Sequence, residues 1–98
     1  MKPQFLVIYR PPRATFNDDA TAEEERIIGD HFGYLKRLLE EGTLLLAGPC
    51  LDASMGIAVL EADSLEAAQA ILARDPAVTG GVFTGEIRPY RVSLMAGR

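Results

Sequence analysis

The feature that most constrains this fold is an N-terminal segment, Gln4–Arg10, that is apolar on both faces of a predicted strand. It is rich in Val, Ile, Phe and Tyr, the residue types that strands favour, and two prolines end it at Pro11 and Pro12. Side chains along a strand alternate between the two faces of a sheet. Because both sets are apolar here, the strand needs cover on both sides.

A long helix is predicted after a loop over Pro11–Asp19. Thr21 and Glu24 have the spacing of a capping box, and Gly42 is suited to end the helix. Between them, apolar residues recur at helical spacing. Gly29 and Gly33 each cost about 1 kcal/mol relative to alanine inside a helix. This pair indicates a close approach by another group, a kink, or simple tolerance.

A hairpin is predicted next, because two short apolar runs, Thr43–Ala47 and Met55–Ala62, are separated by a turn. The first run ends at Gly48-Pro49, and Gly56 marks a bulge or a close approach in the second. The short connection requires the two strands to be antiparallel.

The last third of the chain predicts a second helix and a final strand. Asp63-Ser64 caps the helix, and Asp75-Pro76 ends it, because the residue before proline avoids the helical region. A loop over Ala77–Gly81 leads into a long strand, Val82–Met95. The alternation of this strand shifts near Arg88-Pro89, where a bulge or an edge position is expected.

The predicted order is β-α-β-β-α-β, which is the ferredoxin-like arrangement within one domain, residues 1–98. It places a four-stranded antiparallel sheet under two helices on one face. A chain of 98 residues has no third layer, and a domain of this size buries only about 60% of its unfolded surface. We therefore expect a homodimer in which the open, apolar sheet faces of two copies pack together.

Composition narrows the function. The net charge is −4 with a pI of about 4.9, which argues against binding nucleic acid or an anionic membrane surface. No segment has the ~18 consecutive apolar residues of a membrane span. The single cysteine, Cys50, fits a reducing cytoplasmic setting. The spacing of Cys and His predicts no metal site, and no glycine-rich phosphate loop or other cofactor motif is found.

His31, the only histidine, lies on or beside the apolar face of the long helix and needs a polar partner. A lone histidine in that position is more often a core residue than a catalyst. Asp75 is the best candidate partner, because a carboxylate at a helix C-terminus is unfavourable by roughly 0.3–1 kcal/mol. Asp-Pro also commonly opens a turn. If the helix begins near Thr21, the two side chains lie a turn or two apart, whereas a start after Gly29 would bring them together.

Four further residues are candidates for contact with a substrate. Tyr34 lies one turn from His31, and Tyr9 ends the first strand, although both also suit the core. Arg88 could hold a carboxylate or phenolate, but a solvated strand charge is the more common arrangement. Ser54, in the hairpin turn, is the fourth candidate.

Several segments resemble the YCII (YciI-like) family over nearly the whole chain: His31–Leu35, Leu44–Pro49, Leu60–Ser64, Asp75-Pro76 and Glu86–Tyr90. The resemblance implies a dimeric α+β barrel of ferredoxin-like protomers. It also implies that the family's histidine and aspartate, which are suspected of catalysis, are His31 and Asp75. Most members have no assigned activity, and one relative is a dehydrochlorinase acting on a chlorinated hydroxyquinol.

These observations favour a small cofactor-free lyase, isomerase or dehydrohalogenase. His31 would transfer a proton on a small organic substrate, and Asp75 would fix its tautomer and stabilise the imidazolium. The alternative is a non-catalytic dimer that binds a small molecule or acts as a regulatory accessory. A third possibility is a structural dimer in which His31 only completes a buried polar network.

Overall fold

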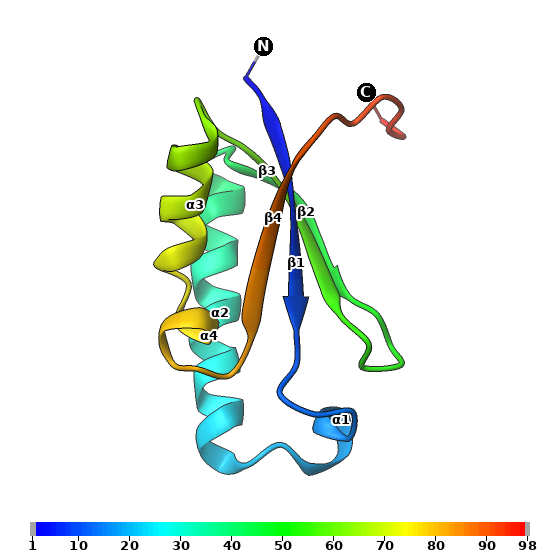
Figure 1. The fold of residues 1–98 in the computed structure, drawn as a ribbon, viewed down its shortest axis with the longest axis vertical. Helices are drawn as coiled ribbons and strands as arrows, with labels where there is room; N and C mark the ends of the chain where they lie inside the picture. Colours follow the sequence, from blue (N-terminus) through cyan, green and yellow to red (C-terminus); the bar gives the residue numbers. More distant parts are fainter. Residues whose placement is uncertain (1, 98) are drawn as a thin grey trace.

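Four antiparallel strands form one sheet with helices on one face in the computed structural model, which describes residues 2–97 (Figure 1). The sheet order is β2-β3-β1-β4. The predicted ferredoxin-like arrangement is therefore confirmed. The elements in chain order are β1 (Gln4–Arg10), α1 (Phe16–Asp19), α2 (Ala22–Glu40), β2 (Leu44–Pro49), β3 (Gly56–Glu61), α3 (Leu65–Ala73), α4 (Pro76–Thr79) and β4 (Thr84–Tyr90).

The two main helices begin where their caps predict. The Thr21 hydroxyl accepts a hydrogen bond from the Glu24 amide at 3.1 Å, and the Glu24 carboxylate accepts one from the Thr21 amide at 2.9 Å. Gly42 follows the end of α2 with a φ of 83°, a conformation that glycine adopts readily. At α3, the Ser64 hydroxyl accepts from the amide of Ala67. Within residues 2–97, no helix is both long and apolar enough to cross a bilayer.

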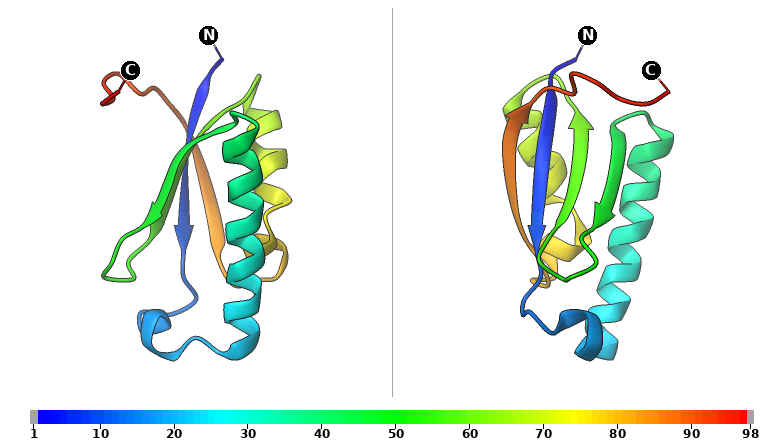
Figure 2. Two further views of the ribbon diagram at one scale, coloured as in Figure 1. Left: turned by 180° about the vertical axis from the view of Figure 1, so that it is seen from behind. Right: turned by 90° about the vertical axis from the view of Figure 1, so that its right-hand side faces the viewer.

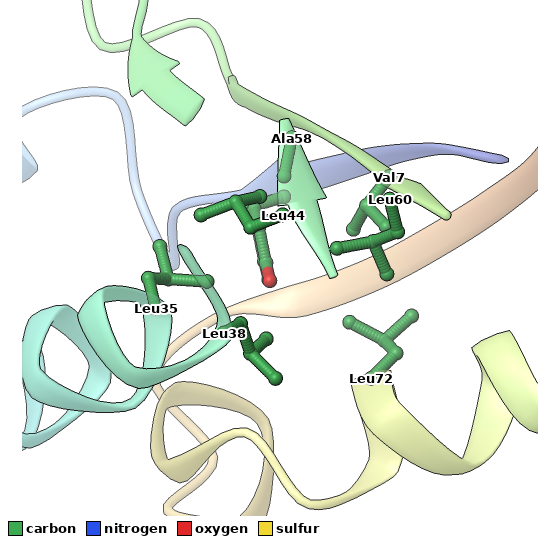
Figure 3. Packing of buried hydrophobic residues seen from close by; sticks show 8 residues of the cluster. Val7, Leu35, Leu38, Leu44, Ala58, Leu60 and Leu72 are labelled. Atoms are coloured by element: carbon green, nitrogen blue, oxygen red, sulfur yellow. The ribbon is translucent and has the colours of Figure 1, made fainter. Parts of the chain in front are cut away.

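The core lies between the two main helices and the face of the sheet that they cover (Figure 3). Leu35 and Leu38 of α2 and Leu72 of α3 point toward the strands. The strands contribute alternate residues, as the pleat requires, including Val7, Leu44, Ala58 and Leu60. α2 is thereby fixed against the sheet.

Two of the predicted loops contain short helices. α1 forms inside the expected loop Pro11–Asp19 because Phe16 is buried, with its ring centroid 5.8 Å from that of Phe83. α4 overlaps the expected loop Ala77–Gly81 and begins one residue before it, at Pro76. Proline suits the first turn of a helix because it has no amide hydrogen to leave unpaired.

The final strand is shorter than predicted and spans Thr84–Tyr90. It ends at Tyr90 because its partner strand begins opposite it, at Gln4. At its start, the amides of Val82 and Phe83 donate to the carbonyl of Ala77 instead of joining the sheet. β4 is an edge strand with a continuous register through Pro89, so the edge position is confirmed and no bulge forms there.

The hairpin also differs from the sequence expectation in detail. Gly56 pairs regularly with Pro49 and Tyr9, and the irregularity in the ladder lies in β2, between Leu44 and Leu46. A Cβ at Gly56 would make only ordinary contacts with its neighbours. Neither the bulge nor the close approach expected at Gly56 is found, and the bulge lies in β2 instead.

The opposite side of the sheet, which we call the outer face, is not covered by either main helix (Figure 2), and it combines apolar residues with Glu86 and Arg88 of β4. Its register brings together Leu6, Ile8, Leu46 and Val59. Leu46 is 41% exposed, and Leu6 and Ile8 are half-buried. The expected open face is therefore present in this chain.

Gly29→Ala should raise the free energy of unfolding by about 0.5–1 kcal/mol. Gly29 is exposed inside α2, and a Cβ there would have no described atom within 4 Å. Urea denaturation measures the change. Gly42→Ala, where φ is positive, should lower stability in the same assay. A loss of stability in Gly29→Ala would contradict the finding that a Cβ at this position has free space around it.

Candidate active site

His31 and Asp75 are in direct contact. His31 Nδ1 lies 2.7 Å from Asp75 Oδ1 and 2.9 Å from Oδ2. Asp75 is fully buried, and His31 is 9% exposed. The contact forms although α2 begins at Ala22, so the later start that the sequence suggested is not needed.

The position of Asp75 explains how the two side chains meet. α3 ends at Ala73, and Asp75 is the N-cap of α4, where its carboxylate accepts from the amide of Ala77 at 2.9 Å. Asp75 thus follows the C-cap of α3 as expected, but it also begins α4, which the sequence did not predict. An aspartate is favoured at an N-cap. α4 packs against α2 and directs the carboxylate toward His31.

Three donors converge on this carboxylate. Besides His31 and Ala77, the Tyr9 hydroxyl donates to Oδ2 at 2.8 Å. An ionised carboxylate is an acceptor only, so we assign the ring proton to Nδ1. Nε2, at the other side of the ring, has no hydrogen-bond partner among residues 2–97. It therefore carries the free lone pair in the neutral ring.

Aromatic rings hold the imidazole from two sides. The ring centroid of Tyr9 lies 5.1 Å from that of His31 at an interplanar angle of 80°, and Phe83 lies 5.6 Å away at 84°. Edge-to-face contacts of this kind are favourable and restrict ring orientation. The histidine is thus fixed both by its hydrogen bond and by its packing.

A cavity of about 420 Å³ opens beside His31. It lies between the middle of α2, the end of β1 and the turn end of the β2–β3 hairpin, which diverges from α2 in Figure 2. α1 supplies Phe16 to its wall. The lining residues are mostly apolar: Tyr9, Pro11, Phe16, Asn17, Ile28, His31, Phe32, Leu35, Ala47, Gly48, Pro49, Cys50, Ala53, Met55, Gly56, Ile57 and Phe83.

Tyr9 contributes to both the cavity and the polar network. Burial raises the pKa of its phenol well above the usual range, and the neighbouring Asp75 charge raises it further. Tyr9 therefore stays protonated at physiological pH and acts as a donor. Together with Ala77, it holds Asp75 in the orientation that faces His31.

The remaining candidates lie away from the cavity wall. The Tyr34 hydroxyl donates to the carbonyl of Ile71 at 2.7 Å and joins α2 to α3. Ser54 is exposed and donates to Asp52 within the hairpin turn. Arg88 is exposed on β4 and pairs with Glu86 at 3.0 Å. Of the four, the structure brings only Tyr9 to the His31–Asp75 pair.

The sequence interpretation missed the aromatic wall formed by Phe16, Phe32 and Phe83. Phe32 could have been suspected, because it directly follows His31 and lies one turn from Ile28 on the predicted helix. In the structure it is 62% exposed and lines the cavity. Nothing in the sequence marked the other two. Among residues 2–97, no group of three or more His, Cys, Asp or Glu side chains is arranged to hold a metal ion.

Comparison with protein families gives one match across most of the chain. The model described as the YCII-related domain matches residues 5–91. An uncharacterised protein, YjpA, of Bacillus subtilis (strain 168) is 45% identical over 69 residues, which cover 70% of this chain and 80% of that protein.

Solved structures with the same fold are more distant in sequence. Muconolactone isomerase superposes with a TM-score of 0.70 at 19% identity, covering 97% of this chain and 96% of that one. The 5-chloro-2-hydroxyhydroquinone dehydrochlorinase of Burkholderia phenoliruptrix AC1100, in complex with 2,5-dihydroxybenzoquinone, has a TM-score of 0.60 at 20% identity, covering 89% and 93%. SnoaB, a cofactor-independent oxygenase of Streptomyces nogalater, has a TM-score of 0.52 at 17% identity, covering 99% and 98%. The chain has the protomer fold of the dimeric α+β barrel proteins.

Asp75→Asn should both destabilise the fold and change the His31 tautomer. An amide offers one acceptor oxygen and turns its NH₂ group toward a donor, so one of three buried donors loses its partner. We expect a loss of roughly 1–3 kcal/mol in urea denaturation. Nitrogen-15 shifts of the ring should move from the Nδ1–H toward the Nε2–H form. An unchanged tautomer would contradict the assignment.

Tyr9 should make stability depend on alkaline pH. Because its pKa is raised in the folded state, unfolding releases a proton above the ordinary tyrosine value of 10.0. This contribution is complete below that pH and is lost as pH rises toward the folded pKa, by up to about 1.4 kcal/mol per pH unit. Denaturation between pH 9 and 11 measures the slope. Tyr9→Phe should reduce it, and an equal slope would contradict the prediction.

Proposed function

Because this chain belongs to the YCII-related domain family, we propose that it is a small cofactor-free enzyme that transfers a proton on a small organic substrate. The reaction class is that of a lyase, an isomerase or a dehydrohalogenase. His31 is the general base or acid. Asp75 and Tyr9 position it, and the adjacent cavity holds the substrate.

The observation that carries this proposal is the division of roles between the two nitrogens of His31. Nδ1 is engaged by the buried Asp75, whereas Nε2 has no hydrogen-bond partner among residues 2–97 on a ring that lines the cavity. A purely structural histidine would use both nitrogens within the core. A general base must instead reach the proton that it removes.

The chemistry follows from this geometry. Nε2 accepts a proton from a carbon or oxygen of the substrate, and Asp75 stabilises the imidazolium that results. The electron pair left behind moves into an adjacent carbonyl, or it expels a leaving group from the neighbouring carbon. Returning the proton to another carbon gives isomerisation, and loss of the leaving group gives elimination.

The fold neighbours are compatible with this type of chemistry. They include an isomerase, a dehydrochlorinase and a cofactor-independent oxygenase. Their identity to this chain is 20% or less, so they do not transfer a substrate. They support the general class of reaction. The class of substrate has to be inferred from the residues that line this cavity.

We also infer that a second copy of the chain covers the outer face. Leu6, Ile8 and Leu46 leave apolar surface exposed there, which is unfavourable in water. The fold neighbours belong to the dimeric α+β barrel class. A cytoplasmic location belongs to the same proposal, and it rests on the single cysteine, Cys50, which is free and exposed.

His31→Asn tests proton transfer. Asparagine retains a donor in place of Nδ1 and lacks the atom that corresponds to Nε2. With 2-tetralone, a ring ketone with acidic C–H groups, we expect the protein to accelerate exchange in D₂O, measured by proton NMR. The variant should lose about 100-fold or more of this acceleration.

The matched control for that assay is Tyr34→Phe. Tyr34 lies on the same helix but binds the carbonyl of Ile71 and not the cavity, so its removal should leave exchange unchanged. Equal exchange by the parent protein and His31→Asn would reject His31 as the base. It would favour a cavity that binds its ligand without catalysis.

Leu46→Asp tests the dimer. A charge at this outer-face position should shift sedimentation velocity toward the monomer, because it would be buried unpaired between two sheets. Leu39→Asp is the matched control, since Leu39 is 54% exposed but lies on α2. A parent protein that sediments as a monomer would contradict the inference.

A further inference from the structure

We propose that the cavity beside His31 takes uncharged ring compounds and discriminates against molecules that already carry a carboxylate or phosphate. This deepens the proposed function by naming the substrate class of the same cavity. This inference rests on the proposed function only in taking the cavity beside His31 as the substrate site. The evidence is the composition of the wall, the charge of the His31–Asp75 pair and the location of the nearby cations.

The cavity wall carries no formal charge of its own. Among residues 2–97, the lining contains no Lys, Arg, Asp or Glu side chain. Its polar side chains are Tyr9, Asn17, His31 and Cys50, and the remaining residues are apolar or glycine. A ligand that enters this space exchanges water for apolar groups. An ion does so at high cost unless a partner of opposite charge is present.

The His31–Asp75 pair cannot supply a net positive charge. With a neutral imidazole the pair carries −1, and with an imidazolium it carries zero. The negative member, Asp75, is fully buried and is not screened by water. An anionic ligand near His31 therefore meets at best a neutral pair, and it meets a negative pair whenever the imidazole is neutral.

Two cations, Arg13 and Lys36, lie over aromatic rings of the wall but do not line the cavity themselves. The Arg13 guanidinium binds Glu24 at 2.8 Å and Asp19 at 2.7 Å, and it lies over the Phe16 ring, 5.6 Å from its centroid. Lys36 is exposed, with its Nζ 5.6 Å from the centroid of Phe32. Neither residue lines the wall. Sites that select carboxylates or phosphates place such a cation in direct contact with the anion.

The wall instead suits a flat apolar ring. Phe16, Phe32 and Phe83 border the cavity together with Tyr9, and aromatic rings pack favourably by edge and offset contacts. The volume of about 420 Å³ lies within the range of small-molecule sites. One polar group on such a ring can meet Nε2 of His31, which is the acceptor without a partner.

Two probes that share one ring system test the charge preference. 2-Naphthol is neutral at pH 7.5 and can donate its hydroxyl to Nε2, whereas 2-naphthoate carries a carboxylate on the same ring system. Titrations followed by the His31 ring signals in NMR give both dissociation constants. We expect 2-naphthol to bind at least about tenfold more tightly. Absence of saturable 2-naphthol binding, or 2-naphthoate binding equally well, would overturn the proposal.

A charge-introducing variant sharpens the test. Phe32 is 62% exposed on the wall, so Phe32→Lys should fold and place an ammonium at the cavity. It should tighten 2-naphthoate binding several-fold and weaken 2-naphthol. Leu39→Lys, two turns along α2 and outside the lining, should change neither constant. An equal gain in the control, or no gain in Phe32→Lys, would count against a charge-selective wall.

The two proposals fail by different measurements. The exchange of 2-tetralone in His31→Asn concerns proton transfer only. The ratio of the two naphthalene dissociation constants concerns the ligand class only. If the protein binds 2-naphthol more tightly than 2-naphthoate but does not accelerate exchange, the proposed ligand class holds and the proposed enzymatic role is rejected.

Discussion

The structure around the cavity depends on one buried carboxylate, that of Asp75. Burying a charge is unfavourable by several kcal/mol unless hydrogen bonds replace the lost water. Here Tyr9 of β1, His31 of α2 and the amide of Ala77 in α4 supply them together. Three elements that are distant in sequence must therefore be placed correctly at the same time. The same network that stabilises the packing of α4 on α2 also orients the imidazole.

Much of the architecture could be predicted because it is encoded locally. The apolar pattern of Gln4–Arg10, the capping box at Thr21 and the glycine after α2 each specify an element with little help from the rest of the chain. The ends of β4 could not be predicted in this way, because they are set by register against β1 and by the bonds that close α4. The short helix α1 also depends on a tertiary contact, since burial of Phe16 stabilises it.

Within the candidate site, the sequence could predict only the residue pair in which a buried polar side chain needs a hydrogen-bond partner. A single histidine beside an apolar face needs a buried acceptor, and Asp75 was the carboxylate that matched. Tyr34 and Tyr9 looked equivalent in sequence, yet the first binds a backbone carbonyl and the second binds Asp75. Which side chains of a helix or strand face a cavity depends on how that element packs in the folded protein, and the sequence does not show this. For the same reason, Phe16 and Phe83 carried no signal before the fold was known.

The apolar wall and the buried pair act together in the proposed chemistry. When a neutral substrate gives its proton to His31, one new positive charge forms between two negative ones, the Asp75 carboxylate and the substrate anion. The net charge of the assembly stays at −1 throughout, and each new charge has an adjacent partner of opposite sign. A substrate that was already an anion would add a second negative charge to a space that contains no cation among the described residues of its wall. The electrostatics that would allow proton transfer from a neutral ring are thus the same electrostatics that would reject a charged one.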